Sequence, residues 1–71
     1  MKGFKENSDG RPATVLIVED LDWVRSSMKK AIERLGYRTV QATDDAEAFA
    51  VAERESINLI VTEEQVPPSM S

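Results

Sequence analysis

The stretch TVLIVEDLDW, residues Thr14–Trp23, carries the pattern that decides the fold of this 71-residue chain. It opens with a continuous apolar run rich in β-branched side chains, which is typical of a strand buried on both faces of a parallel sheet. The run ends at two acids, Glu19 and Asp20. A second apolar run, Leu59–Thr62, ends in the same way at Glu63. The sequence therefore predicts two buried strands that each present acidic residues at the carboxyl end.

A helical period follows the first strand. Apolar residues recur at spacings of three and four from Leu21 to Leu35, which predicts an amphipathic helix. Asp22 is placed to cap the start of this helix, and Gly36 is placed to end it in the left-handed conformation. Trp23, in the first turn, is expected to be half-buried and to shield the acidic end of the sheet.

The second half of the chain repeats this alternation. Tyr37–Ala42 is predicted to be a strand, and DDAE at Asp44–Glu47 is a capping-box-like start for a helix over about Asp45–Glu55. The inner face of that helix is expected to carry Ala48, Phe49 and Ala52. The order strand, helix, strand, helix, strand predicts parallel strands with right-handed crossovers. This is the first half of a doubly wound α/β sheet.

Composition narrows the chemistry that the chain can perform. It has no cysteine and no histidine, which excludes disulfides, thiolate or histidine-liganded metal sites and histidine-based triads. A net charge of -4 argues against nucleic acid as a partner. No apolar run reaches the roughly 20 residues of a membrane span, and the polar N-terminus lacks the apolar core of a signal peptide. We expect a cytoplasmic protein.

The chain divides into three parts by composition. Residues 1–13 are rich in Gly, Lys, Asn, Ser and Pro without a period, so we expect a disordered leader. Residues 14–67 form the predicted domain, and residues 68–71 are expected to be a disordered tail.

The acids at the strand ends form the candidate site. Parallel strands open their carboxyl ends on one edge of a sheet, where ligands bind. Glu19, Asp20 and Glu63 converge there if the first and third strands are neighbours. Such oxygen ligands suit Mg²⁺, which proteins hold through one or two carboxylates with waters and phosphate oxygens. The alternative is that both strands end in polar residues only because those ends face water.

At these residues a family resemblance emerges. Residues 15–67, VLIVEDLDWVRSSMKKAIERLGYRTVQATDDAEAFAVAERESINLIVTEEQVP, resemble the N-terminal half of the receiver domain of two-component response regulators. The matching features are an apolar strand followed by an acidic pair, a helix ending in LGY, the ATDDAEA segment, and a strand running to an acid with a proline four residues later. The resemblance implies an incomplete flavodoxin-like βαβαβ fold with strand order 2-1-3.

The same resemblance implies a role in phosphorelay signal transduction. In receivers a histidine kinase passes a phosphoryl group to an aspartate at the end of the third strand, beside Mg²⁺ held by the acidic pair. Glu19 and Asp20 match that pair, Asp20 as the direct ligand, and Gln65 stands where a backbone carbonyl completes the metal site. Glu63 stands where the acceptor aspartate is expected, and Pro67 matches the proline of the following loop. The implied partner is a sensor histidine kinase or another receiver-binding protein.

The sequence departs from the receiver pattern in two ways. Glu63 is longer than aspartate by one methylene group, which removes the in-line geometry that attack on phosphorus requires. It either imitates the charge of a phosphorylated aspartate or marks an inactive site. The segment PPSMS does not continue into a fourth strand with Ser or Thr, or a fifth strand with Lys. No general base or cationic clamp is visible, so we expect no enzymatic activity.

Two other interpretations remain open. Without a fourth strand, Leu59–Thr62 is an open apolar edge, which is a template for pairing with another chain. The chain would then be a phosphate-independent interaction module that forms a homo-oligomer or binds a partner through this edge. Alternatively it is a truncated product without a function.

Overall fold

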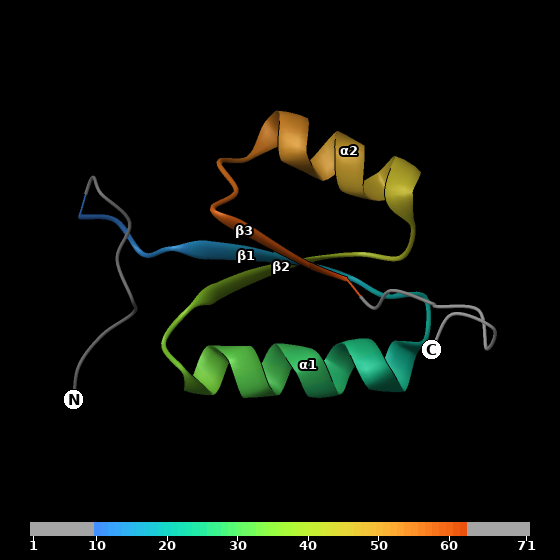
Figure 1. Cartoon of the computed structure of the whole chain (residues 1–71), viewed down its shortest axis with the longest axis horizontal. Coiled ribbons are helices and arrows are strands. Elements are labelled where there is room, and N and C mark those ends of the chain that lie inside the picture. The colour runs from blue at the N-terminus through green and yellow to red at the C-terminus, as the bar shows by residue number, and fades with distance from the viewer. Residues whose placement is uncertain (1–9, 63–71) are drawn as a thin grey trace, which may run out of the picture.

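The computed structural model describes residues 10–62, and its secondary structure follows the predicted order (Figure 1). The elements are β1 (Thr14–Val18), α1 (Asp22–Arg34), β2 (Arg38–Ala42), α2 (Asp45–Arg54) and β3 (Leu59–Thr62). The strands form one three-stranded sheet in the order β2-β1-β3. Both pairings are parallel. The predicted fold class and strand order are therefore confirmed.

The central strand β1 forms the core of the molecule. All of its residues are buried, and the Val15, Leu16 and Ile17 side chains are almost completely inaccessible. Because side chains alternate across a strand, Leu16 and Val18 share one face, where they pack with Val51 of α2. The continuous apolar run predicted a strand covered on both faces, and β1 has that environment.

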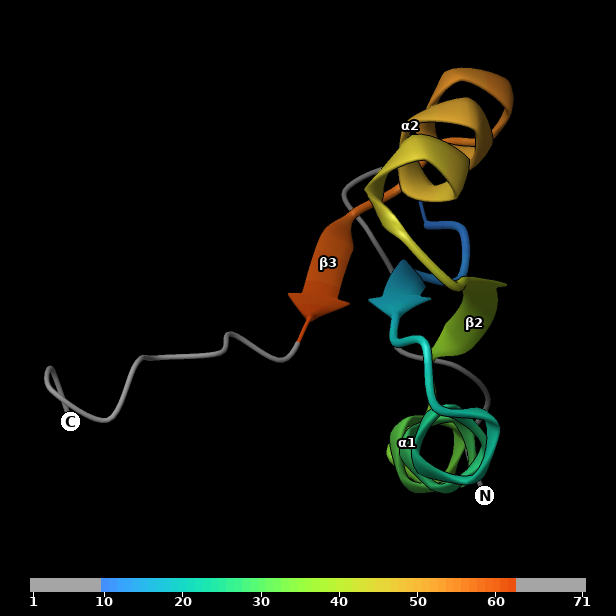
Figure 2. The same cartoon turned by 90° about the vertical axis from the view of Figure 1, so that its right-hand side faces the viewer.

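The two helices cover opposite faces of the sheet, and both lie over β1 and β2 (Figure 2). Neither α1 nor α2 packs against β3. As a result Leu59 and Ile60 of β3 stay 55% and 53% exposed. Within residues 10–62, the third strand is paired along one side only, and neither described helix covers its faces.

Helix α1 begins differently from the prediction. Its N-cap is Leu21, and no side chain caps it, so the prediction that Asp22 caps the helix is wrong. The Asp22 carboxylate instead accepts a hydrogen bond from Arg25 within the first turn. Trp23 is 72% exposed rather than half-buried, because it lies on the side of α1 away from the sheet. Gly36 has a φ of 97° and ends the helix as predicted.

Helix α2 has the predicted cap but a different buried face. Asp44 Oδ1 accepts a hydrogen bond from the Glu47 N–H at 2.8 Å, which confirms the cap. The buried residue of the helix is Val51, and Phe49 is 74% exposed. At 3.6 residues per turn, Ala48 and Val51 share the face above β1, whereas Phe49 is rotated toward the uncovered side. Placing Phe49 and Ala52 on the inner face was therefore wrong, since Ala52 is exposed as well.

The observed bounds differ by one residue from some predicted bounds. The second strand begins at Arg38 instead of Tyr37, and α2 ends at Arg54 instead of Glu55. Ala13, placed by composition in the leader, is buried, and its carbonyl accepts a hydrogen bond from the Arg38 N–H. Residues 1–9 of the predicted leader and the predicted tail, 68–71, lie outside the described residues. Neither described helix has the length and apolar character of a membrane span.

Candidate functional site

The three strands end at the same level of the sheet. Val18 of β1 is in register with Ala42 of β2 on one side and with Thr62 of β3 on the other. A pocket of about 490 Å³ opens at this carboxyl edge. It is lined by residues that end or follow all three strands, namely Val18, Glu19, Asp20, Leu21, Thr43, Asp44, Asp45 and Thr62.

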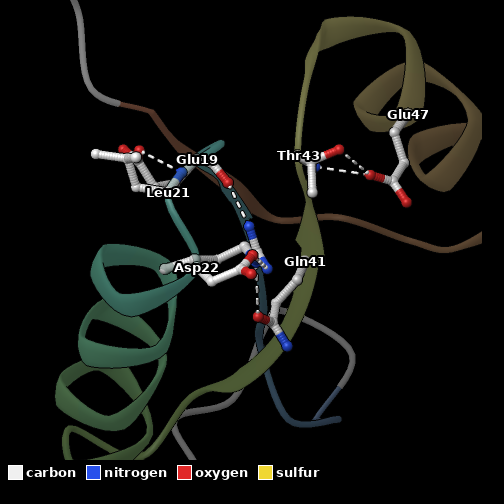
Figure 3. A network of polar contacts seen from close by, with 7 residues as sticks. Glu19, Leu21, Asp22, Gln41, Thr43 and Glu47 are labelled. Carbon is white, nitrogen blue, oxygen red and sulfur yellow. Dashed lines mark hydrogen bonds and ion pairs between the residues drawn. The ribbon is translucent and has the colours of Figure 1, made fainter.

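The two predicted acids of β1 both line this pocket, but their environments differ. Glu19 is only 6% exposed, and its Oε2 accepts a hydrogen bond from the Leu21 N–H at 3.0 Å (Figure 3). Its backbone N–H donates to the Ala42 carbonyl. The Glu19 carboxylate therefore secures the turn between β1 and α1. Asp20 is exposed and also lines the pocket, so its carboxylate is more accessible than that of Glu19.

Three residues after β2 contribute to the pocket and were not predicted to do so. Thr43, Asp44 and Asp45 lie in and just beyond the turn between β2 and α2. We interpreted this segment only as a helix start. The rule applied to β1 and β3 also holds here, because β2 is parallel to them and ends on the same edge. The acids that follow Ala42 were the signal that would have identified them.

The pocket carries a concentration of negative charge. The carboxylates of Glu19, Asp20, Asp44 and Asp45 are among its lining residues, and none of the described lining residues is basic. One oxygen of Asp44 is already used in capping α2. Like charges gathered in this way repel one another. The pocket therefore favours a cation over an anion.

Arg25 is a further residue of this region that the sequence did not reveal. Its Nη1 donates to the Glu19 carbonyl at 2.7 Å, and its Nε donates to the Gln41 side-chain oxygen at 3.2 Å. Nη2 forms an ion pair with the Asp22 carboxylate. Figure 3 shows these acceptors side by side. The Arg25 side chain is only 15% exposed. Through these hydrogen bonds its guanidinium group joins α1 to the ends of β1 and β2.

The Glu47 carboxylate holds the other turn at this edge. It accepts hydrogen bonds from the backbone N–H and the hydroxyl of Thr43, at 2.7 and 2.8 Å (Figure 3). These bonds favour the ionised form, with the backbone bond contributing most, and they lower the pKa of Glu47 below its ordinary value.

The Glu47 pKa leads to a prediction about acid stability. Because folding lowers this pKa, the Glu47 bonds stabilise the fold fully above the ordinary glutamate pKa, and this contribution is lost as the pH falls through the lowered value. Urea unfolding between neutral and acidic pH should therefore give a flatter profile for Glu47→Gln than for the wild type. The pKa of Glu33 is also lowered, mainly by its bond to Thr39. Because Glu33 is present in both proteins, its contribution does not affect the difference between their profiles.

The control for this prediction is Glu53→Gln, which removes an acid from the exposed surface of the same helix. If Glu53→Gln flattened the profile as much as Glu47→Gln, general charge repulsion and not the bonds to Thr43 would explain the acid sensitivity.

The described residues alone do not complete a metal site. Within residues 10–62, no three or more acidic side chains are arranged to hold a metal ion. The Glu19 carboxylate accepts a hydrogen bond from the Leu21 N–H, and Asp20 is the other acid after β1 that lines the pocket. The predicted positions Glu63 and Gln65 lie outside the described residues. Thr62, the residue before Glu63, does line the pocket.

Comparison of the chain with protein-family models, curated proteins and solved structures gave no significant match.

Proposed function

We propose that this chain is a receiver-like module of phosphorelay signalling, which acts by binding its partners and not as an enzyme. The observation that carries the proposal is the meeting of all three parallel strand ends at one acidic pocket. Asp20 follows the central strand there, and Thr62, the last residue before Glu63, reaches the same pocket. The partner is a sensor histidine kinase or another receiver-binding protein.

Within this proposal the residues of the pocket have different roles. Asp20 is the direct ligand for Mg²⁺, whose positive charge would offset the carboxylates around it. Glu19 fixes the turn that presents Asp20, through its bond to the Leu21 N–H. The resemblance assigns the backbone carbonyl of Gln65 to the metal site and Glu63 to the position of the acceptor, and both residues lie outside the described residues. A cation at this site would be held weakly, because Mg²⁺ sites with few protein ligands keep several waters.

The metal part of the proposal predicts that Asp20→Asn abolishes Mg²⁺ binding. For the wild type we expect a dissociation constant on the order of millimolar, since few protein ligands contribute. A Mg²⁺ titration followed by amide NMR shifts measures the difference between the wild type and Asp20→Asn.

The matched control is Asp45→Asn, which removes the same charge from the same pocket but from the end of another strand. It should weaken binding only slightly. Equal losses in both variants would mean that the pocket attracts cations by charge alone and that Asp20 is not a specific ligand. An unchanged titration in Asp20→Asn would remove the metal from the proposal.

The acceptor part of the proposal predicts that the chain does not take up a phosphoryl group. Glutamate is one methylene group longer than the acceptor aspartate of receivers, a length that does not suit in-line attack on phosphorus, and no described lining residue of the pocket is basic. Incubation with acetyl phosphate and Mg²⁺ should leave the intact mass unchanged. A mass gain of one phosphoryl group, lost in Glu63→Gln, would show that Glu63 is a working acceptor.

A further inference from the structure

The proposed function does not use the outer edge of β3. This strand, Leu59–Thr62, has no charged residue and no proline. Sheet edges are usually protected by lysine, proline, a bulge or a covering helix. None of these devices is present on β3 among the described residues.

The backbone groups that face outward on this edge can be identified from the hydrogen bonds of β1. The Arg38 N–H donates to the Ala13 carbonyl, and the Glu19 N–H donates to the Ala42 carbonyl. The backbone N–H and C=O groups of odd-numbered residues in β1 therefore point toward β2. Successive residues of a strand point their backbone groups to opposite neighbouring strands, so the N–H and C=O groups of Leu16 and Val18 point toward β3. In the observed register, Leu59 and Val61 face β1, and Ile60 and Thr62 direct their N–H and C=O groups outward.

An apolar groove lies beside this edge on the α2 face. It has a volume of about 250 Å³. Phe49 and Ala52 of α2 line one side of it, and Ile60 of β3 lines the other. The Phe49 side chain is 74% exposed and the Ile60 side chain is 53% exposed. Exposed apolar surface next to an open strand is typical of an interface between proteins.

The charges of the molecule are separated along the strand direction. Arg11, Arg38 and Arg54 line a hollow of about 270 Å³ at the amino ends of the strands, where Glu55 is the only acid among the described lining residues. The pocket at the carboxyl ends is acidic. A second copy that pairs antiparallel places its acidic end beside the basic end of the first. A parallel arrangement would place like charges together.

We propose that two copies of this chain pair antiparallel through their β3 edges and form one continuous six-stranded sheet. A twofold axis perpendicular to the sheet leaves each side chain on its own face. The pairing that uses both outward residues sets Ile60 opposite Thr62 of the other copy, with Val61 at the axis. Ile60 and Phe49 of each copy then lie near the axis on the α2 face. This pairing does not depend on the phosphorelay role, because it uses none of the pocket acids.

Sedimentation of the full chain at several concentrations tests the pairing. We expect a monomer–dimer equilibrium with a dissociation constant on the order of micromolar, because the interface is small. Ile60→Lys should weaken association at least tenfold. Its matched control is Leu35→Lys, which places the same charge at a residue of similar exposure, 61%, beyond the end of α1. Leu35→Lys should dimerise like the wild type. Because both variants add one positive charge, a difference between them reflects the position of the lysine and not the net charge.

A cysteine crosslink tests the register independently of any loss of folding in Ile60→Lys. The chain has no cysteine, so Val61→Cys introduces a single thiol at the predicted axis. Residues opposite one another in such a non-hydrogen-bonded pair have Cα atoms roughly 4.5 Å apart, which a disulfide spans. Mild oxidation should give a covalent dimer rapidly. Leu35→Cys should crosslink far more slowly.

Two further variants test whether the attraction between the basic and acidic ends contributes to the pairing. Arg54→Glu and Arg34→Glu each remove a cation from the last turn of a helix, but only Arg54 lines the basic hollow. Arg54→Glu should weaken the dimer more than Arg34→Glu.

Three results would overturn the proposal: a monomer at all concentrations, equal dimerisation of Ile60→Lys and Leu35→Lys, or equal crosslinking of Val61→Cys and Leu35→Cys. The first is also the result expected if residues 63–71 of the same chain cover the edge.

Discussion

Leu16→Ala is expected to unfold the chain almost completely at room temperature. Leu16 is 0% exposed and lies in the middle of the central strand, in a cluster with Val18, Ala42 and Val51. Removing a buried leucine side chain to alanine costs about 2.7 to 5 kcal/mol, because the cavity adds to the lost burial. A domain of this size has few such residues and a correspondingly small free energy of unfolding.

Urea titration followed by circular dichroism measures this effect, at one fixed protein concentration because association would add to the apparent stability. The control is Leu35→Ala, the same substitution at a side chain that is 61% exposed. It should change the free energy of unfolding by less than about 0.5 kcal/mol. A cooperative transition in Leu16→Ala with a loss below about 1 kcal/mol would contradict the assigned core.

Arg25→Ala is expected to have the second-largest effect on stability, a loss of about 2 kcal/mol. The Arg25 side chain is 15% exposed, and it donates to the Glu19 carbonyl and to the Gln41 side chain. Its removal deprives both acceptors of a charged donor and separates α1 from the ends of β1 and β2. The ion pair with Asp22 adds little, because Asp22 is 89% exposed.

Two further variants separate geometry from charge at this position. Arg25→Lys keeps the charge but loses the planar fork that reaches several acceptors at once, so it should recover only a small part of the loss. Arg34→Ala, at an exposed arginine of the same helix, should be nearly neutral. Full recovery in Arg25→Lys would show that the positive charge alone matters, and the assigned hydrogen bonds would then be incidental.

The two functional proposals occupy different sides of the sheet. The acidic pocket lies at the carboxyl ends of the strands, whereas the proposed pairing uses the outer edge of β3. Thr62 belongs to both, because it lines the pocket and also directs backbone groups outward. The Mg²⁺ titration and the sedimentation experiment nevertheless test the two proposals separately.

Most of the candidate site was predictable only in outline. The position of Glu19 and Asp20 after a buried strand placed both at the carboxyl edge, and both line the pocket there. Their different environments were not predictable, because the Leu21 N–H that holds Glu19 becomes available only in the folded turn. The bonds of Arg25 reach from α1 to two strands, and no local pattern in the sequence encodes contacts across that separation.

Patterns in the sequence were enough to predict the helices and strands and the parallel direction of the strands. Hydrophobic period separates strands from helices, and crossover-length connections make the strands parallel. Which side chains of the helices are buried depended on the tertiary structure. Phe49 and Val51 are both apolar residues of α2, but only Val51 is buried, because α2 lies over β1 and β2 and not over β3. Local periodicity is a property of one segment, whereas burial depends on which segments lie beside it.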